Sequence, residues 1–165
     1  MKRFLVFSGS LLMCGILVGC SSDTNEDLIK QTIALMRAAA GDVGNIKSRV
    51  DESIKRANET GKKLDLSEAV EATKKLKEDG DEALKLKRRI EQVHTKVNDD
   101  DRQANAESQK GNLNLALSDL LKKRSELRTA LDDAEKFQGG RFKTAVQDLR
   151  DKIVEAEGPF AQLSR

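Results

Sequence analysis

The chain has 165 residues, of which 35% are charged, and its 30 Lys and Arg nearly balance its 28 Asp and Glu. Trp and Tyr are absent and Pro occurs once, a composition that favours long helices. Because both signs of charge are mixed along the chain, composition gives no electrostatic case for a nucleic-acid-binding protein.

Residues 1–20 have the order of features found in an export signal. Lys2 and Arg3 form a positive start, residues 4–18 are largely apolar, and the small Gly19 precedes Cys20. The run LVGC over residues 17–20 resembles the lipobox of bacterial lipoproteins. This resemblance implies cleavage between Gly19 and Cys20, a diacylglyceryl group on the Cys20 thiol, and a further acyl chain such as palmitate on the new amino group. We therefore expect residues 1–19 to be a removed signal peptide.

The alternative for this region is a transmembrane anchor with an incidental cysteine. The apolar run is about 15 residues, shorter than the ~20 that a helix needs to span a bilayer. Sorting is inferred by resemblance: in enterobacterial lipoproteins an Asp after the cysteine retains the protein in the inner membrane. Here Ser21 follows Cys20, which favours the outer membrane over the inner one. Residues 20–25 would then be the lipidated cysteine and a short linker.

Removal of residues 1–19 changes both charge and cysteine content. Lys2 and Arg3 leave with the signal, so 28 basic and 28 acidic residues remain and the mature chain is formally neutral. Cys14 leaves as well and Cys20 carries lipid, so no disulfide forms within the mature chain.

The first predicted helix follows the linker and ends near Asn58, with Gly61 as the stop. Apolar residues at seven-residue intervals form a stripe that favours coiled-coil-like packing: Ile29, Met36, Val43, Val50 and Ala57. Gly41 and Gly44 weaken the middle of this helix or let a neighbouring helix approach closely.

The second predicted helix opens at Asp65, with Glu68 three residues later as in a capping box. Its stripe is again spaced by seven: Ala69, Leu76, Ala83, Ile90 and Val97. Asp79-Gly80-Asp81 looks like a break, but the stripe keeps its phase across Gly80. We predict one continuous helix with a weak point there.

Residues 98–112 are the least readable part of the chain, and the sequence leaves open whether they are helix or loop. We favour a turn at 98–101 followed by the polar start of a third helix, because Asp99–Asp101 suit a helix N-terminus. A strong apolar stripe follows: Leu113, Leu117, Leu120, Leu127, Leu131, Ala134 and Phe137.

A turn is predicted at residues 138–141, and a shorter fourth helix runs from there to about Glu157. Gly158-Pro159 is expected to end it, since proline cannot continue a helix. Phe137 and Phe142 flank the turn and should clamp the two helices together. The predicted fold is all-α: an elongated antiparallel helical bundle over residues 26–158, with three long helices, a shorter fourth and a tail at 159–165.

Candidate chemistry is sparse. Glu91-x-x-His94 has the spacing by which one helix of a ferritin-like protein offers two metal ligands, but His94 is the single histidine. Asp99–Asp101 lacks the alternating ligands, glycine and terminal Glu of a calcium loop. No phosphate-binding glycine loop and no nucleophile with a positioned base is evident. We therefore predict no catalytic residue, no metal, no cofactor and no small-molecule substrate.

The sequence thus predicts a non-enzymatic envelope protein, held to the membrane by lipidated Cys20, that acts as a spacer, scaffold or accessory subunit. Because the fourth helix covers only about half the bundle, the membrane-proximal half would keep three helices and an apolar groove. The alternative is a binding module that captures an envelope, host or peptidoglycan partner through such a groove or an exposed tip. The heptad spacing also suits pairing with a second copy or a partner helix.

Overall fold

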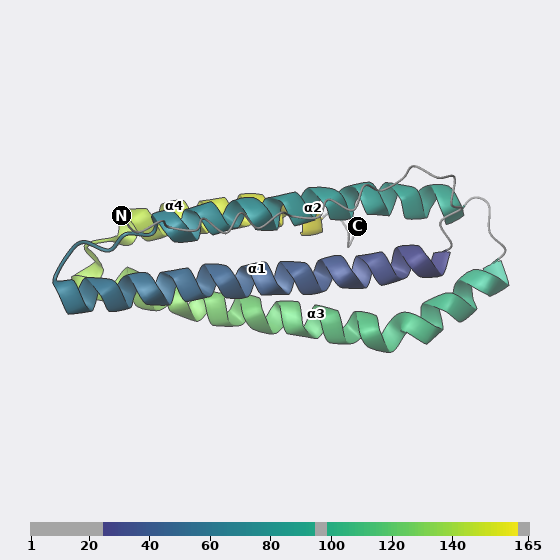
Figure 1. Cartoon of the computed structure of the whole chain (residues 1–165), viewed down its shortest axis with the longest axis horizontal. Helices are drawn as coiled ribbons and strands as arrows, with labels where there is room; N and C mark the ends of the chain where they lie inside the picture. The colour runs from purple at the N-terminus through teal and green to yellow at the C-terminus, as the bar shows by residue number, and fades with distance from the viewer. Residues whose placement is uncertain (1–24, 95–98, 162–165) are drawn as a thin grey trace, which may run out of the picture.

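The structure is a computed structural model that describes residues 25–94 and 99–161, and in this part of the chain it is an all-α bundle (Figure 1). Its elements are α1 (Asn25–Thr60), α2 (Ser67–His94), α3 (Asp99–Lys136), a short 3-10 helix η1 (Phe137–Gly140) and α4 (Lys143–Ala161). The all-α fold, with three longer helices and a shorter fourth, is confirmed. Across the described ranges, no helix combines the length and apolarity that crossing a membrane would require.

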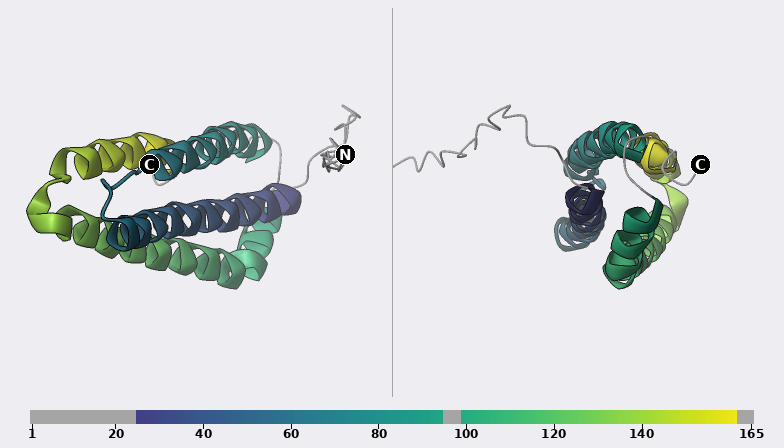
Figure 2. Two further views of the ribbon diagram at one scale, coloured as in Figure 1. Left: turned by 60° about the vertical axis from the view of Figure 1, so that its left-hand side comes forward. Right: turned by 90° about the vertical axis from the view of Figure 1, so that its right-hand side faces the viewer.

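Consecutive helices run in opposite directions, but the packing pairs differ from the order along the chain. α1 packs against α2 and α3, α2 packs against α4, and α3 and α4 pack much less extensively. α1 and α4 therefore lie opposite each other, with α2 and α3 on the two sides between them (Figure 2). In this arrangement α3 runs parallel to α1 and α4 runs parallel to α2, so α2 and α3 are sequence neighbours without being packing neighbours.

The core lies along the inner sides of all four helices and follows the predicted stripes in part, since the stripe residues Ile29 and Met36 are only half-buried and Leu117 is exposed. Its largest fully buried side chains are Leu28, Val43, Ile46, Val50, Leu76, Val146 and Leu149. Every buried hydrophobic residue of the described segments lies between Leu28 and Ala156. The described helices therefore supply a core of their own, and we expect a chain that begins at Ser21 to fold on it.

The turn between α1 and α2 uses the residues that the sequence indicates, with one difference. Gly61 has φ +65°, a left-handed conformation that ends α1 as predicted. The Asp65 carboxylate accepts a hydrogen bond from the Ser67 backbone N–H at 3.0 Å, which lowers the pKa of Asp65. Glu68 does not complete a capping box. It instead accepts hydrogen bonds from Arg56 and Arg49 of α1, at 2.9 and 3.0 Å, so it ties the two helices together.

The turn between α3 and α4 reverses the chain over residues 138–140, all of which have positive φ. Gln138 adopts φ 49° without being a glycine, and Gly139 and Gly140 follow at 70° and 82°. The rings of Phe137 and Phe142 stack across this turn with their centroids 6.0 Å apart. The predicted aromatic clamp between the two helices is confirmed.

The prediction that α4 ends at Gly158-Pro159 is wrong, because α4 continues to Ala161 with Pro159 inside it. Proline removes one backbone donor, but only two residues of the helix follow, so the loss falls on the last turn. A Cβ built on Gly80 of α2 would lie 3.0 Å from Cβ of Pro159 and 3.1 Å from Cε2 of Phe160. Gly80 is therefore the point at which the end of α4 rests on an unbroken α2.

Three further predictions concern the long helices: the continuity of α2, the start of α3 and the two glycines of α1. α2 is continuous across Gly80, as predicted. α3 begins at Asp99, so residues 99–112 are helix and not loop. The predicted turn at 98–101 is therefore wrong for 99–101, which form the first turn of α3, and residue 98 lies outside the described residues. Close approach at the two glycines of α1 is not found: a Cβ on Gly41 would meet nothing within 4 Å, and one on Gly44 would meet only Cδ of Lys123 at 3.7 Å.

Candidate functional site

The candidate site, which we call the trough, is an apolar cavity at the end of α4, lined among others by Met36, Leu117, Leu121 and Phe160, where the half of the bundle that α4 does not reach begins. α4 stops beside Gly80, whereas α2 continues to His94 and α3 begins at Asp99 at that same end of the bundle (Figure 1). In this half α1 forms the floor, and α2 and α3 form the two walls. The fourth side, which α4 covers in the other half, is not covered by any described residue.

A cavity of about 620 Å³ opens where α4 ends, within the ~300–1,000 Å³ range typical of ligand sites. Met36, Ala39 and Val43 of α1 contribute to its lining. The other helices contribute Leu76 of α2, Leu117, Leu120, Leu121 and Arg124 of α3, and Val154, Glu157, Gly158 and Phe160 of α4. All four helices therefore meet at this cavity, and its surface is mainly aliphatic.

The apolar stripe of α3 changes from buried to exposed along its length. Leu127 and Leu131, which lie beside α4, are 2% and 5% exposed. Leu121 and Leu117, about two and three turns before Leu127, are 52% and 42% exposed and line the cavity. Leu117 belongs to the same heptad-like stripe as Leu127 and Leu131, so its exposure arises because no fourth helix covers it and not from the sequence pattern, whereas Leu121 lies beside that stripe.

Ion pairs fasten the end of α4 to both walls of the trough. On the α3 side, the Arg124 guanidinium donates to both carboxylate oxygens of Glu157 at 2.7 Å, in a bidentate pair. On the α2 side, Lys77 Nζ donates to Oε1 of Glu155 at 2.6 Å, which raises the pKa of Lys77 and lowers that of Glu155. At the end of α4, therefore, α2 and α3 supply the cations and α4 supplies the carboxylates.

Between α1 and α2, the buried Asp42 and the half-buried Asp79 form a pair of carboxyl groups that the sequence did not indicate. Asp42 is 7% exposed, and its Oδ1 accepts a hydrogen bond from Lys75 Nζ at 3.3 Å. The Oδ2 atoms of Asp42 and Asp79 are both buried without a hydrogen-bond partner. Two carboxylates cannot bond to each other unless one holds a proton. Burial, and then the charge of Asp42, accordingly raises the pKa of Asp79.

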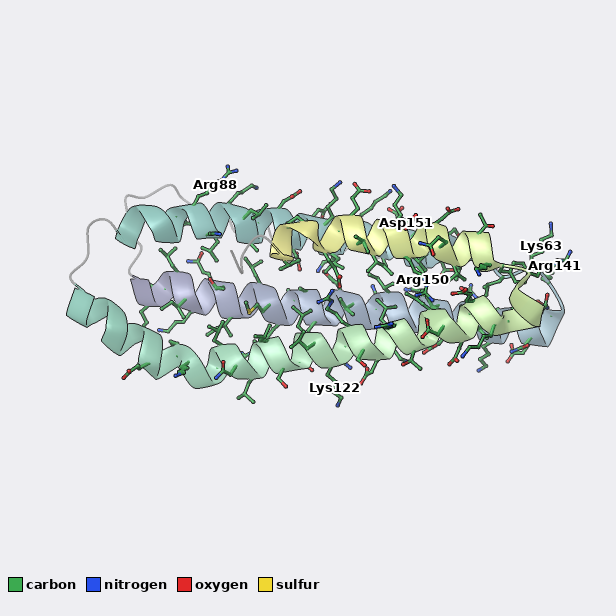
Figure 3. All side chains as sticks on the ribbon, turned by 180° about the vertical axis from the view of Figure 1, so that it is seen from behind. Lys63, Arg88, Lys122, Arg141, Arg150 and Asp151 are labelled. Atoms are coloured by element: carbon green, nitrogen blue, oxygen red, sulfur yellow. The ribbon has the colours of Figure 1, made fainter. Side chains whose placement is uncertain are left out.

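The opposite end of the bundle is a polar tip. Lys63 and Arg141 lie at this end in Figure 3, and Arg150 points between α4 and α3. Arg150 donates to Asp132 at 2.7 Å and to Glu135 at 3.0 Å. A second, more open hollow of about 630 Å³ lies beside this cluster and the glycine turn. Four of its six lining residues are charged (Asp132, Glu135, Lys136 and Lys143), so the tip offers less apolar surface for a ligand than the trough.

The sites predicted from the sequence lie partly outside the described residues. Gly19 and Cys20 are outside them, as are the side chains of Glu91 and His94 at the end of α2. Within the described segments, no three side chains of metal-binding type come together. Among the residues that line the trough cavity, only Arg124 and Glu157 carry charge, and they neutralise each other. Chemically the cavity suits apolar contact more than proton or group transfer.

The sequence predicted the open groove from the length of the fourth helix, but not its lining. The burial of Asp42 and Asp79 was missed because neither lies on a heptad stripe, and 79–81 read as a weak point. No protein-family model, curated protein or solved structure matches the chain. Function is therefore inferred from its residues and geometry.

Proposed function

We propose that this protein is a non-enzymatic bacterial lipoprotein, anchored through acylated Cys20, whose helical bundle serves as a scaffold, spacer or accessory subunit at the cell envelope. The signal-like order of residues 1–20, ending in the lipobox-like LVGC, is the observation on which the anchor rests. Two or more acyl chains on one cysteine suffice for stable membrane attachment. The outer membrane is the preferred location, because Ser21 and not Asp follows the cysteine.

The anchor would fix the orientation of the bundle. Only residues 21–24 separate Cys20 from Asn25, where α1 begins. The start of α1, and with it the open trough, would therefore face the membrane. The α1–α2 turn and the glycine turn before α4 would be the distal tip. At ~1.5 Å per residue, the 36 residues of α1 place that tip about 50 Å farther out.

The anchor is tested by growing cells that express the full chain with a radiolabelled or alkyne-tagged fatty acid. We expect the label to enter the protein and to be lost in Cys20→Ser, because the thiol is the acceptor. Cys14→Ser is the matched control, since Cys14 lies inside the signal and should leave labelling unchanged. An unlabelled wild-type chain, or equal labelling of Cys20→Ser, would contradict the proposal.

A second candidate function, a binding module, is favoured by the exposed leucines of the trough. Contiguous apolar surface at a concave site is typical of protein–protein or ligand contact. A passive spacer has no need for Leu117 and Leu121 to remain 42% and 52% exposed. Site-specific photo-crosslinking in cells from position 121, compared with position 115 on the outer side of α3, separates the two functions. A product specific to position 121 supports binding, and its absence supports a spacer.

A further inference from the structure

We propose that the trough is the seat of a partner's α-helix, and that this helix carries an apolar stripe with acidic residues on both edges. This inference rests on the binding function proposed above and names the chemistry of the partner. The occupant follows from two observations: the continuity of the α4 interface into the empty half, and the charges that line its edges.

Continuity comes from the helices on which α4 packs. α2 extends about 21 Å beyond Gly80, because fourteen residues at ~1.5 Å separate Gly80 from His94. α1 and α3 run alongside this extension. Leu28, Leu86 and Ala116 are buried between these helices, whereas Ile29 and Leu113 are each half-buried. A helix placed in line with α4 would meet α2 and α3, on which α4 packs, and the α1 residues that line the cavity. Beyond the cavity, α2 is thus long enough to hold a helix of roughly four turns in line with α4.

Charge complementarity specifies the edges of that helix. Where α4 is present, Lys77 of α2 pairs with Glu155, and Arg124 of α3 pairs with Glu157. Eleven residues beyond Lys77, or about three turns, α2 carries Arg88 on nearly the same side. Fourteen residues before Arg124, or about four turns, α3 carries Lys110.

These two cations are available to a partner. Arg88 and Lys110 are exposed, and within the described residues neither forms an ion pair. Arg88 projects from the outer edge of α2 (Figure 3). α4 itself buries Ile153 and Ala156 and carries the exposed Glu155 and the half-buried Glu157 at its two edges. A partner helix in line with α4 is expected to have the same arrangement. The partner helix should therefore place acids against α2 and α3 and aliphatic side chains against α1.

The test uses the chain from Ser21 onward with Cys20 absent, which folds on its own core, and two lactam-stapled peptides of eighteen residues. Both peptides carry the same Leu and Ala stripe at three- and four-residue spacing, and one has Glu and the other Lys on the two edges. Stapling is needed because unconstrained helices of this length are marginal in water. We expect the acidic peptide to bind at least tenfold more tightly, measured by fluorescence anisotropy at low salt.

Variants locate the binding and its charge preference. Leu121→Glu should reduce binding of the acidic peptide at least tenfold. Its matched control is Leu115→Glu, a 68% exposed leucine on α3 that does not line the cavity and should leave binding unchanged. The double variant Arg88→Glu with Lys110→Glu should reverse the preference between the two peptides. Far-UV circular dichroism and Tm show whether each variant stays folded.

The proposal is overturned if neither peptide binds below millimolar concentration, or if both bind equally. It is also overturned if Leu115→Glu weakens binding as much as Leu121→Glu, or if the Arg88→Glu and Lys110→Glu double variant still prefers the acidic peptide. Dimerisation that Leu121→Glu abolishes would assign the seat to a second copy, and binding of a monomeric lysophospholipid in place of the peptides would assign it to an acyl chain. Peptide binding does not involve Cys20, so failure here is distinct from failure of the lipid anchor.

Discussion

The contact between Gly80 and the end of α4 gives the sharpest test of the bundle, because two substitutions of the same type can be compared. Gly80 and Gly41 both lie inside long helices, on α2 and α1 respectively. Gly→Ala in a helix interior gains about 0.5–1 kcal/mol from backbone propensity and from the unfolded state. This gain is common to both positions, so the difference between the two variants isolates the packing at Gly80.

The structure predicts opposite signs for the two substitutions. At Gly41 a new Cβ would meet nothing within 4 Å, so Gly41→Ala should raise the free energy of unfolding by about 0.5–1 kcal/mol. At Gly80 the new Cβ would lie 3.0 Å from Pro159 and 3.1 Å from Phe160, and overpacking of this kind costs about 1–3 kcal/mol. Gly80→Ala should therefore be destabilising by about 1 kcal/mol in net terms.

The assay is urea unfolding of both variants and the wild type, followed by circular dichroism at 222 nm. The expected separation of about 2 kcal/mol between the variants corresponds to roughly 4–8 °C in Tm for a domain of this size. Equal stabilisation by both alanines would refute the reasoning, because it would mean that α4 does not rest on α2 at Gly80. Combining Gly80→Ala with Phe160→Ala, which removes the nearest ring, should recover part of the loss.

Three further predictions follow from burial and charge. Asp79→Asn should stabilise the protein at pH 7 by on the order of 1 kcal/mol, because the half-buried Asp79 carboxylate lies against the charge of Asp42 and its Oδ2 has no hydrogen-bond donor. Burial raises the pKa of Asp79, so the wild type loses stability as the pH rises through that pKa, and the advantage of Asn should grow from pH 4 to pH 7. Arg150→Gln should be destabilising at pH 7 and less so in acid, because Arg150 lowers the pKa of the α3 aspartate that it binds, and that stability disappears as the pH falls through the lowered value. Leu149→Ala, at a fully buried position, should cost about 2–5 kcal/mol, whereas Val154→Ala, at a 68% exposed one, should change stability by less than ~0.5 kcal/mol.

Chemical denaturation at several pH values measures the first two, with Asp81→Asn as the exposed control for Asp79. A pH-independent effect of Asp79→Asn would mean that the buried pair does not hold a proton in the folded state. If Arg150→Gln became more damaging in acid, the ion pairs of the tip would not be the source of its effect. Similar costs for Leu149→Ala and Val154→Ala would show that α4 is not seated on the bundle with the face described.

The sequence predicted most of the local structure because helix and turn signals depend on nearby residues. Spacing by three and four identified all four helices, and the positive φ of Gly61 and of the glycine turn matches the residues that tolerate it. Phase continuity across Gly80 correctly indicated one helix. Pro159 was misjudged because a proline near a helix end loses only one hydrogen bond, and its ring packs against Gly80 of another helix.

By itself, then, the sequence determined the helices, their apolar stripes and the short reach of the fourth, since each follows from backbone geometry and periodicity along a single segment. Only the tertiary structure decided that α3 lies parallel to α1, that Asp42 faces Asp79, and that the leucine stripe of α3 is buried at one end and open at the other. The physical reason is that the burial of a side chain depends on which other segment packs against it. A stripe repeats identically along a helix, but it leaves water only where another helix covers it.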